Sequence, residues 1–193
     1  MIDYIKGTLT QLNPTFITLE SGGIGYFINI SLHTYSRLEG IAEAKILVHE
    51  VIREDAHQLF GFADHTERDI FRHLISVTGV GANTARMMLS SVSPEEIEKA
   101  ILSSDVNLLK SVKGIGLKTA QRIIVDLKDK LGKQAGSAEI FAFADNTRRE
   151  EALSALVMLG FAKSAVSKVL DKIVREEKNL TVEDLIKRAL KNL

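Results

Sequence analysis

The first third of the chain alternates apolar and polar residues in short runs separated by turn residues. Asn13-Pro14 and Gly22-Gly23 mark two of these turns. β-branched and aromatic side chains recur with a two-residue period in residues 4–9, 16–19, 25–30, 45–51 and 58–62. The pattern predicts about five strands within residues 1–63, a number and length typical of an OB-type β-barrel. Another small barrel would give the same pattern.

The apolar period changes from two residues to about 3.6 near Asp64. Ser93-Pro94-Glu95-Glu96 forms a capping box with proline at the first helical position, so one helix is expected to begin there. Residues 64–131 are therefore predicted to form an all-α domain of about four or five short helices.

Helical periodicity is lost in residues 132–146. Small and polar residues prevail in this segment, which is predicted to be a linker. Ile140, Phe141 and Phe143 are more apolar than a free linker requires, and their role is left open.

Residues 147–193 return to helical spacing and show three amphipathic runs, which predict a three-helix bundle. Thr181, with Asp184 three residues later, is expected to cap the last helix. A unit of fewer than about fifty residues buries only a modest core, so the bundle is expected to be marginally stable and tethered. The whole chain is thus predicted to be an α+β multidomain protein.

The helical middle contains an internal repeat. Residues 74–85 recur 35 positions later as residues 109–120, with Leu, Ser, Val, Gly, Gly, Thr and Ala identical at matching offsets. Each copy places a Gly-x-Gly turn between two helical stretches, as in a helix-hairpin-helix unit. Glycine permits a positive φ, and the N–H groups that start the following helix can bind a phosphate oxygen. The tandem copies predict a domain that grips the DNA backbone and reads no base sequence.

The expected DNA contacts differ between the two hairpins. In the first hairpin they are Gly79, Val80, Gly81, Asn83, Thr84 and Arg86. In the second hairpin they are Gly114, Ile115, Gly116, Lys118, Thr119 and Arg122. Lys118 and Arg122 lie one helical turn apart and can reach the same phosphates, whereas the first copy has Asn83 and Met87 there. The second hairpin is expected to supply more of the electrostatic attraction, and the first to rely on backbone N–H groups.

Other interpretations of the Gly-x-Gly turns are weaker. A single copy would be explained about equally well as a turn between two packed helices, but duplication favours phosphate binding. A phosphate-binding ATPase loop is excluded because Gly116-Leu117-Lys118-Thr119 has no glycine directly before the lysine. A dinucleotide fingerprint is excluded because the glycines lie between helices rather than after a strand.

Composition limits the chemistry that the chain can perform. Its 193 residues include no cysteine, which excludes disulfides, thiolate metal sites and cysteine nucleophiles. The five histidines are not clustered, and no catalytic residue, metal ligand or cofactor is predicted. The first residues show neither a basic nor an apolar targeting segment, so a cytoplasmic protein with no membrane partner is expected.

Charge is balanced overall, with 25 basic and 25 acidic residues, but it is unevenly distributed. Residues 1–62 carry four basic and seven acidic side chains, a net charge of −3. Residues 107–131 carry six basic and two acidic side chains, a net charge of +4. Because phosphate binding requires cations, DNA is expected to contact the segment around the second hairpin.

The order of the predicted domains and several local strings resemble the RuvA family of Holliday-junction-binding subunits. These strings are Val51-Ile52-Arg53-Glu54-Asp55-Ala56, Leu59-Phe60-Gly61-Phe62, Gly114-Ile115-Gly116 with Lys118-Thr119-Ala120, and Leu159-Gly160-Phe161. The resemblance covers essentially the whole chain. It implies a non-catalytic subunit that binds four-way DNA junctions as a homotetramer, or as an octamer around the junction, in recombination and DNA repair.

The resemblance also implies partners and further roles. Residues 147–193 would contact a RuvB-type hexameric AAA+ ATPase that drives branch migration, and a RuvC-type resolvase is a further candidate partner. Glu54 and Asp55 match the family's acidic pin, which repels phosphates at the crossover; without the resemblance they would be interpreted as a solvated turn. Ala82 and Asn83 depart from the family pattern, in which proline and lysine commonly follow the second glycine of the first hairpin.

Two other functions are compatible with the sequence. A helix-hairpin-helix module could assist a repair nuclease or glycosylase by binding duplex DNA, in which case a carboxylate cluster or metal ligand set would be expected. A protein-interaction adaptor with a helical tail would show no salt-dependent DNA binding.

Overall fold

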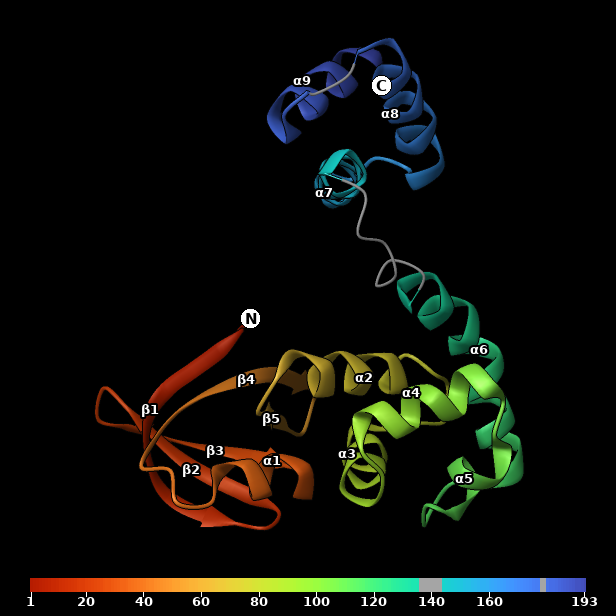
Figure 1. Ribbon diagram of the computed structural model, residues 1–193. Helices are drawn as coiled ribbons and strands as arrows, with labels where there is room; N and C mark the ends of the chain where they lie inside the picture. Colours follow the sequence, from red (N-terminus) through yellow and green to blue (C-terminus); the bar gives the residue numbers. More distant parts are fainter. Residues whose placement is uncertain (136–143, 178–179) are drawn as a thin grey trace. The chain divides into compact units, whose positions relative to one another are not determined.

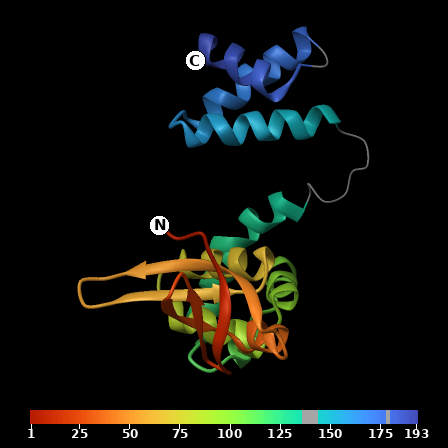
Figure 2. The same ribbon diagram turned by 90° about the vertical axis from the view of Figure 1, so that its left-hand side faces the viewer.

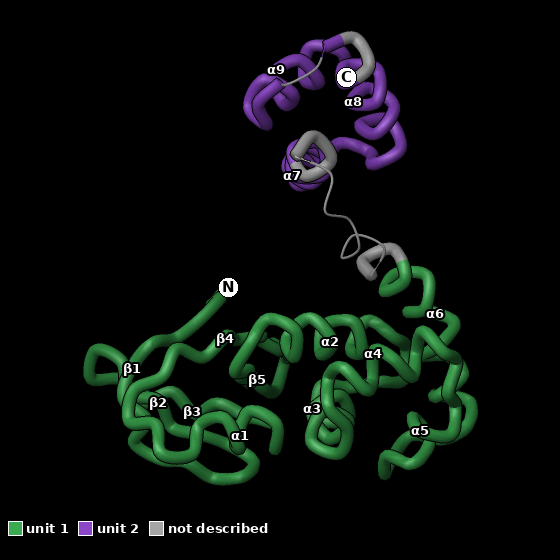
Figure 3. The backbone as a smooth tube through the Cα atoms, in the orientation of Figure 1, with its two compact units in different colours: residues 1–136 green, residues 137–193 purple. Residues whose placement is uncertain are grey.

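The chain forms two compact units, residues 1–136 and residues 137–193 (Figure 3). The computed structural model describes residues 1–135, 144–177 and 180–193. The first unit contains a β-barrel and a helical part, and the described residues of the second form three helices (Figure 1). The predicted α+β architecture, with a barrel, a tandem helix-hairpin-helix part and a three-helix bundle, is confirmed.

Five strands close the barrel in the order β1-β2-β3-β5-β4. The strands are β1 (Tyr4–Asn13), β2 (Phe16–Ser21), β3 (Ile24–Ile30), β4 (Glu43–Ile52) and β5 (His57–Phe62). Neighbours are antiparallel except β3 and β5, which pair in parallel. The two-residue period of the sequence is the inside-outside alternation of the barrel, because Ile17, Leu19, Ile28 and Ile30 are buried and the residues between them face outward.

A short helix that the sequence pattern did not predict, α1 (Leu32–Leu38), connects β3 to β4. Ser31 caps it by accepting a hydrogen bond from the Thr34 N–H at 3.1 Å. At seven residues the helix is too short to establish a 3.6-residue period, so the flanking strands dominate the sequence signal.

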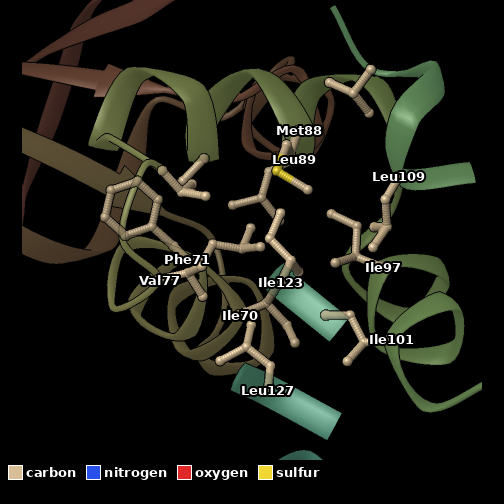
Figure 4. Close-up of a cluster of buried hydrophobic side chains, with 14 of the residues drawn as sticks. Ile70, Phe71, Val77, Met88, Leu89, Ile97, Ile101, Leu109, Ile123 and Leu127 are labelled. Carbon is tan, nitrogen blue, oxygen red and sulfur yellow. The ribbon is translucent and has the colours of Figure 1, made fainter. Parts of the chain in front are cut away.

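The helical part of the first unit has five helices among its described residues: α2 (His65–Ile75), α3 (Ala82–Ser91), α4 (Pro94–Ser103), α5 (Val106–Ser111) and α6 (Leu117–Ala135). The capping box at Ser93 and Glu96 is confirmed. The core of the helices is continuous with the barrel, since Phe60 and Phe62 of β5 pack on Phe71 of α2. Figure 4 shows the side chains that fill this core, among them Met88, Leu89, Ile97, Leu109 and Ile123.

The join between the barrel and α2 is polar as well as apolar. Glu67 is fully buried and accepts hydrogen bonds from the hydroxyl groups of Ser31 and Thr34. Burial raises the pKa of Glu67, and these hydroxyl bonds oppose that shift. The adjacent Arg68 is also buried, and its Nη1 donates to Asp3 Oδ1 at 2.7 Å. The start of β1 is thereby held to α2.

Helix α6 continues to Ala135, four residues into the segment interpreted as a linker, and α7 (Ala144–Met158) begins before that segment ends. Gly132, the first residue of the predicted linker, thus lies within α6. One glycine in a helix costs about 1 kcal/mol, which is small beside the packing of Leu127 and Leu131 on the core. Ile140, Phe141 and Phe143 lie outside the described residues.

The second unit consists of α7, α8 (Lys163–Glu176) and α9 (Val182–Asn192) around its own small apolar core. Arg149 of α7 bridges to α8, where its Nη2 lies 2.6 Å from Asp171 Oδ1 and 2.8 Å from Ser167 Oγ. The predicted cap of the last helix is confirmed, because Thr181 Oγ1 accepts from the Asp184 N–H at 3.1 Å.

Candidate nucleic-acid interface

The two copies of the repeat fold into hairpins with the same backbone geometry. Gly79 and Gly114 have φ values of +95° and +92°, and neither position would bring a Cβ within 4 Å of another atom. The positive φ, rather than lack of space, is therefore what requires glycine there. In each copy the helix after the turn begins with the same bond, from Ala85 N–H to Gly81 O and from Ala120 N–H to Gly116 O, both at 2.9 Å.

Val80 and Ile115, the residues between the paired glycines, have buried side chains in the helical core. Their N–H groups are also engaged, because Val80 donates to Val77 O at 3.0 Å and Ile115 donates to Val112 O at 3.1 Å. Both residues were predicted among the DNA contacts. The structure shows that their side chains pack inside the turn and that their N–H groups already have acceptors in the protein.

The candidate phosphate donors are the N–H groups of the first turns of α3 and α6, which precede the first intrahelical bond of each helix. Gly81 provides no side-chain cap for α3, and Gly116 has no side chain with which to cap α6. Other helices begin differently, since the side chains of Ser31, Asp64, Ser93, Asp105 and Thr181 accept a bond from their first turns. Helix α8, which follows Ala162, shares the uncapped start. The hairpin helices thus present N–H groups and a positive dipole end to an anion.

The second hairpin carries the cations. Lys110, Lys113, Lys118 and Arg122 are all exposed around it. The equivalent positions of the first hairpin, 35 residues earlier, hold the uncharged residues Ile75, Thr78, Asn83 and Met87. The predicted asymmetry in charge between the hairpins is present in the structure.

Lys113 is a candidate contact that the sequence argument did not single out. It is exposed and lies directly before Gly114 in the turn. The sequence feature that could have identified it is its position in the net-positive segment of residues 107–131. Arg122 Nε lies 3.6 Å from Asp126 Oδ2 one turn further along α6, where Arg122 is exposed and Asp126 is half-buried. Such a surface pair is weak, so Arg122 can exchange Asp126 for a phosphate.

The remaining predicted contacts separate into two groups. Asn83 is exposed and Thr84 half-buried at the start of α3, as is Thr119 at the start of α6. Arg86 lies one turn later, where its Nη1 donates to Thr15 O at 2.8 Å and to Asn29 Oδ1 at 3.2 Å. Burial against the barrel lowers the pKa of Arg86 from its usual value. The structure therefore brings Arg86 to the barrel instead of to the hairpin turn.

Glu54 and Asp55 lie at the tip of the β4–β5 hairpin, which projects from the barrel (Figure 2). Arg53 N–H donates to Ala56 O at 2.8 Å and closes the turn, and both carboxylates are exposed. By contrast, Glu50 lower on β4 accepts from the Ile2 N–H at 2.8 Å, which lowers its pKa. The two tip carboxylates thus place two neighbouring negative charges on an exposed turn, away from the hydrophobic cores.

Groups of three or more acidic or histidine side chains able to hold a metal ion do not occur in the parts of the chain that the structure describes. Within those same parts, none of the helices is long and apolar enough to cross a membrane.

Comparison with known proteins covers the chain in three segments. Residues 1–61 match the RuvA N terminal domain, residues 71–129 match the SAM-like helix-hairpin-helix tandem, and residues 147–193 match the RuvA C-terminal domain. A protein of Christiangramia forsetii named Holliday junction branch migration complex subunit RuvA is 53% identical over 193 residues, all of both chains. Proteins of the same name from Flavobacterium psychrophilum and Bacteroides thetaiotaomicron are each 49% identical, again over all of both chains. With both hairpins, the barrel and the C-terminal helices aligned along its full length, the chain belongs to the RuvA family.

Proposed function

We propose that this chain binds four-way DNA junctions by their phosphate backbones and acts as the non-catalytic, DNA-gripping subunit of a branch-migration complex. The observation that carries the proposal is the pair of equivalent hairpins, each ending in an uncapped helix N-terminus, in a chain that aligns end to end with Holliday junction branch migration subunits. Backbone contacts of this kind suit a substrate that is defined by its shape and has no fixed sequence.

The two hairpins contribute to DNA binding in different ways. The second hairpin supplies long-range attraction through Lys113, Lys118 and Arg122, together with the N–H groups at the start of α6. The first hairpin, without cations at the matching positions, holds a phosphate through the N–H groups of α3, assisted by Asn83 and Thr84. Asn83 stands where the family commonly has lysine, so the attraction between the first hairpin and DNA acts over a shorter range and depends less on salt.

Assembly around the junction belongs to the same proposal. Four copies related by a closed symmetry would place about eight carboxylates from Glu54 and Asp55 around one axis. These charges repel phosphates at the crossover and favour DNA strands that diverge into separate arms. An octamer that encloses the junction, a RuvC-type resolvase as a further partner and a cytoplasmic location remain predictions.

The motor contact is proposed to lie on the second unit. Met158, Leu159 and Phe161, at the turn between α7 and α8, are 86%, 62% and 36% exposed as whole residues. Gly160 between them has a φ of +98°, which fixes the turn that presents these side chains. An exposed apolar cluster of this kind is suited to a protein partner, here an AAA+ ATPase of the RuvB type. The alternative of an accessory module for a nuclease or glycosylase is less well supported, because the aligned relatives share the whole chain.

Replacing Lys118 and Arg122 together by alanine is expected to weaken binding to all junction sequences equally. The slope of log affinity against log salt should fall by about one to two units. Each phosphate contact that is lost means that about one fewer counterion leaves the DNA on binding. Gel shifts with a four-way junction and a linear duplex across a salt series measure both quantities. Wild-type protein should prefer the junction, and equal affinity for both DNAs would contradict the proposed function.

A matched control removes two exposed cations from the second unit, Lys168 and Lys187. Lys187 resembles Arg122 in having a surface partner one turn away, Glu183 at 2.7 Å. The control should leave the salt slope unchanged. If it lowers the slope as much as the hairpin variant does, the effect reflects total charge and the assignment of Lys118 and Arg122 is wrong.

A further inference from the structure

Both helices of the first hairpin are fastened to the barrel. Helix α2 is held by the buried Glu67 and Arg68 and by the aromatic packing of Phe71. Helix α3 is held by hydrogen bonds from Arg86 and to Ser90. The second hairpin is built differently, because α5 and α6 pack on α4, and α6 also on α2. The direction in which the first hairpin presents its phosphate-binding end therefore depends on its bonds to the barrel.

Arg86 is at the centre of the α3 attachment. Its Nη1 donates to two acceptors on adjoining segments of the barrel, the Thr15 carbonyl in the β1–β2 turn at 2.8 Å and the Asn29 amide oxygen on β3 at 3.2 Å. Asn29 is itself fixed, since its Nδ2 donates to Leu59 O on β5 at 3.2 Å. Ser90, one turn after Arg86, accepts from the Leu32 N–H at 3.1 Å and donates to the Arg86 carbonyl at 2.9 Å.

The chemistry of these bonds separates Arg86 from the phosphate-binding cations. Both of its acceptors are neutral, and the side chain is half-buried against the barrel, whereas Lys118 and Arg122 are exposed. A guanidinium remains protonated at neutral pH and donates in fixed directions, so it holds its acceptors in one geometry. Arg86 thus fixes the start of α3, one turn away, relative to the β1–β2 turn and β3. Strand β3 is in turn bonded to β5 of the acidic hairpin through Asn29.

We propose that Arg86 is a positioning residue for junction selectivity, which sets the angle between the first hairpin and the barrel through Thr15 and Asn29. The proposal rests on the proposed function. A linear duplex needs only the hairpins, so a small change in that angle matters little to it. A four-way junction must meet the hairpins and the carboxylates of Glu54 and Asp55 at the same time, and that requires a fixed angle.

Replacing Arg86 by alanine is expected to reduce junction affinity about tenfold. Binding must then restore an angle that the charged hydrogen bonds held before, and the lower end of the stability of such a bond corresponds to about that factor. Duplex affinity and the salt slope should stay close to wild type. Gel shifts with both DNAs over a salt series measure this, with a thermal melt to verify folding. The Lys118 and Arg122 double variant is the reference for a phosphate contact, since it lowers affinity for both DNAs and reduces the slope.

Replacing Asn29 by alanine tests the same bond from the barrel side without changing any charge, and it remains informative if the Arg86→Ala protein does not fold. This variant should also lose junction preference, and the double variant should lose little more than either single one, because the two residues act through one contact. The inference is overturned if Arg86→Ala lowers both affinities together with the salt slope, which would indicate a direct phosphate contact. It is equally overturned if Arg86→Ala or Asn29→Ala keeps the full preference for junctions. Wild-type protein without any preference would instead contradict the proposed function.

Discussion

A chain that ends at residue 136 is expected to bind four-way junctions with nearly the affinity of the full chain and to support no motor-driven branch migration. Both hairpins, the acidic tip, the barrel core and the core shared by β5 and the helices lie in residues 1–136, while residues 137–193 have a separate core. Removing the second unit therefore leaves the DNA-binding surface folded and removes the proposed contact with the ATPase. Gel shifts and a strand-exchange assay with the RuvB-type motor measure the two activities.

Point variants distinguish a lost contact from a lost domain. In the full chain, Met158→Ser with Phe161→Ser should reduce motor-driven exchange by at least about tenfold, because exposed apolar side chains near the centre of an interface account for much of its affinity. Leu190→Ser is the matched control, since Leu190 is also exposed, on α9. Truncation that abolishes junction binding would refute this division between the units. Exchange at the wild-type rate in the Met158 and Phe161 variant would show that the motor does not bind at this cluster.

Neutralising the acidic tip by Glu54→Gln with Asp55→Asn is expected to increase affinity, where most substitutions reduce it. Carboxylates close to phosphates raise the free energy of bound DNA, so their loss should tighten duplex binding about threefold to tenfold at low salt. The preference for junctions should fall, and the rate of motor-driven exchange should change. Exposed tip side chains contribute little to stability, so the melting temperature should stay within experimental error. Gel shifts with duplex and junction at several salt concentrations measure the gain.

The control for the tip removes the same charge elsewhere on the barrel, through Glu20→Gln with Glu43→Gln, both of which are exposed. An equal gain in duplex affinity from this pair would show that net charge alone is responsible. Wild-type affinity of the tip variant for both DNAs at every salt concentration would identify Glu54 and Asp55 as an ordinary solvated turn.

The features that the sequence by itself determined are those set by nearby residues. The strand pattern, the capping box at Ser93, the cap at Thr181 and the two glycine turns depend on groups within a few positions of one another. The repeat also revealed the charge asymmetry, because cations and their uncharged counterparts are compared position by position. Local hydrogen bonds and side-chain periods are encoded in spacing, so a single sequence is enough to predict them.

Only the tertiary structure decided what contacts these elements make with one another. It buried the side chains of Val80 and Ile115 and extended α6 through Gly132, because packing on the core outweighs local preference. It also placed Arg86 against Thr15 and Asn29, which are 71 and 57 positions away along the chain. An arginine beside a phosphate-binding turn has the same local sequence whether it faces DNA or a neighbouring barrel. The choice depends on where long-range burial places the strands, and residue spacing within the helix carries no information about it.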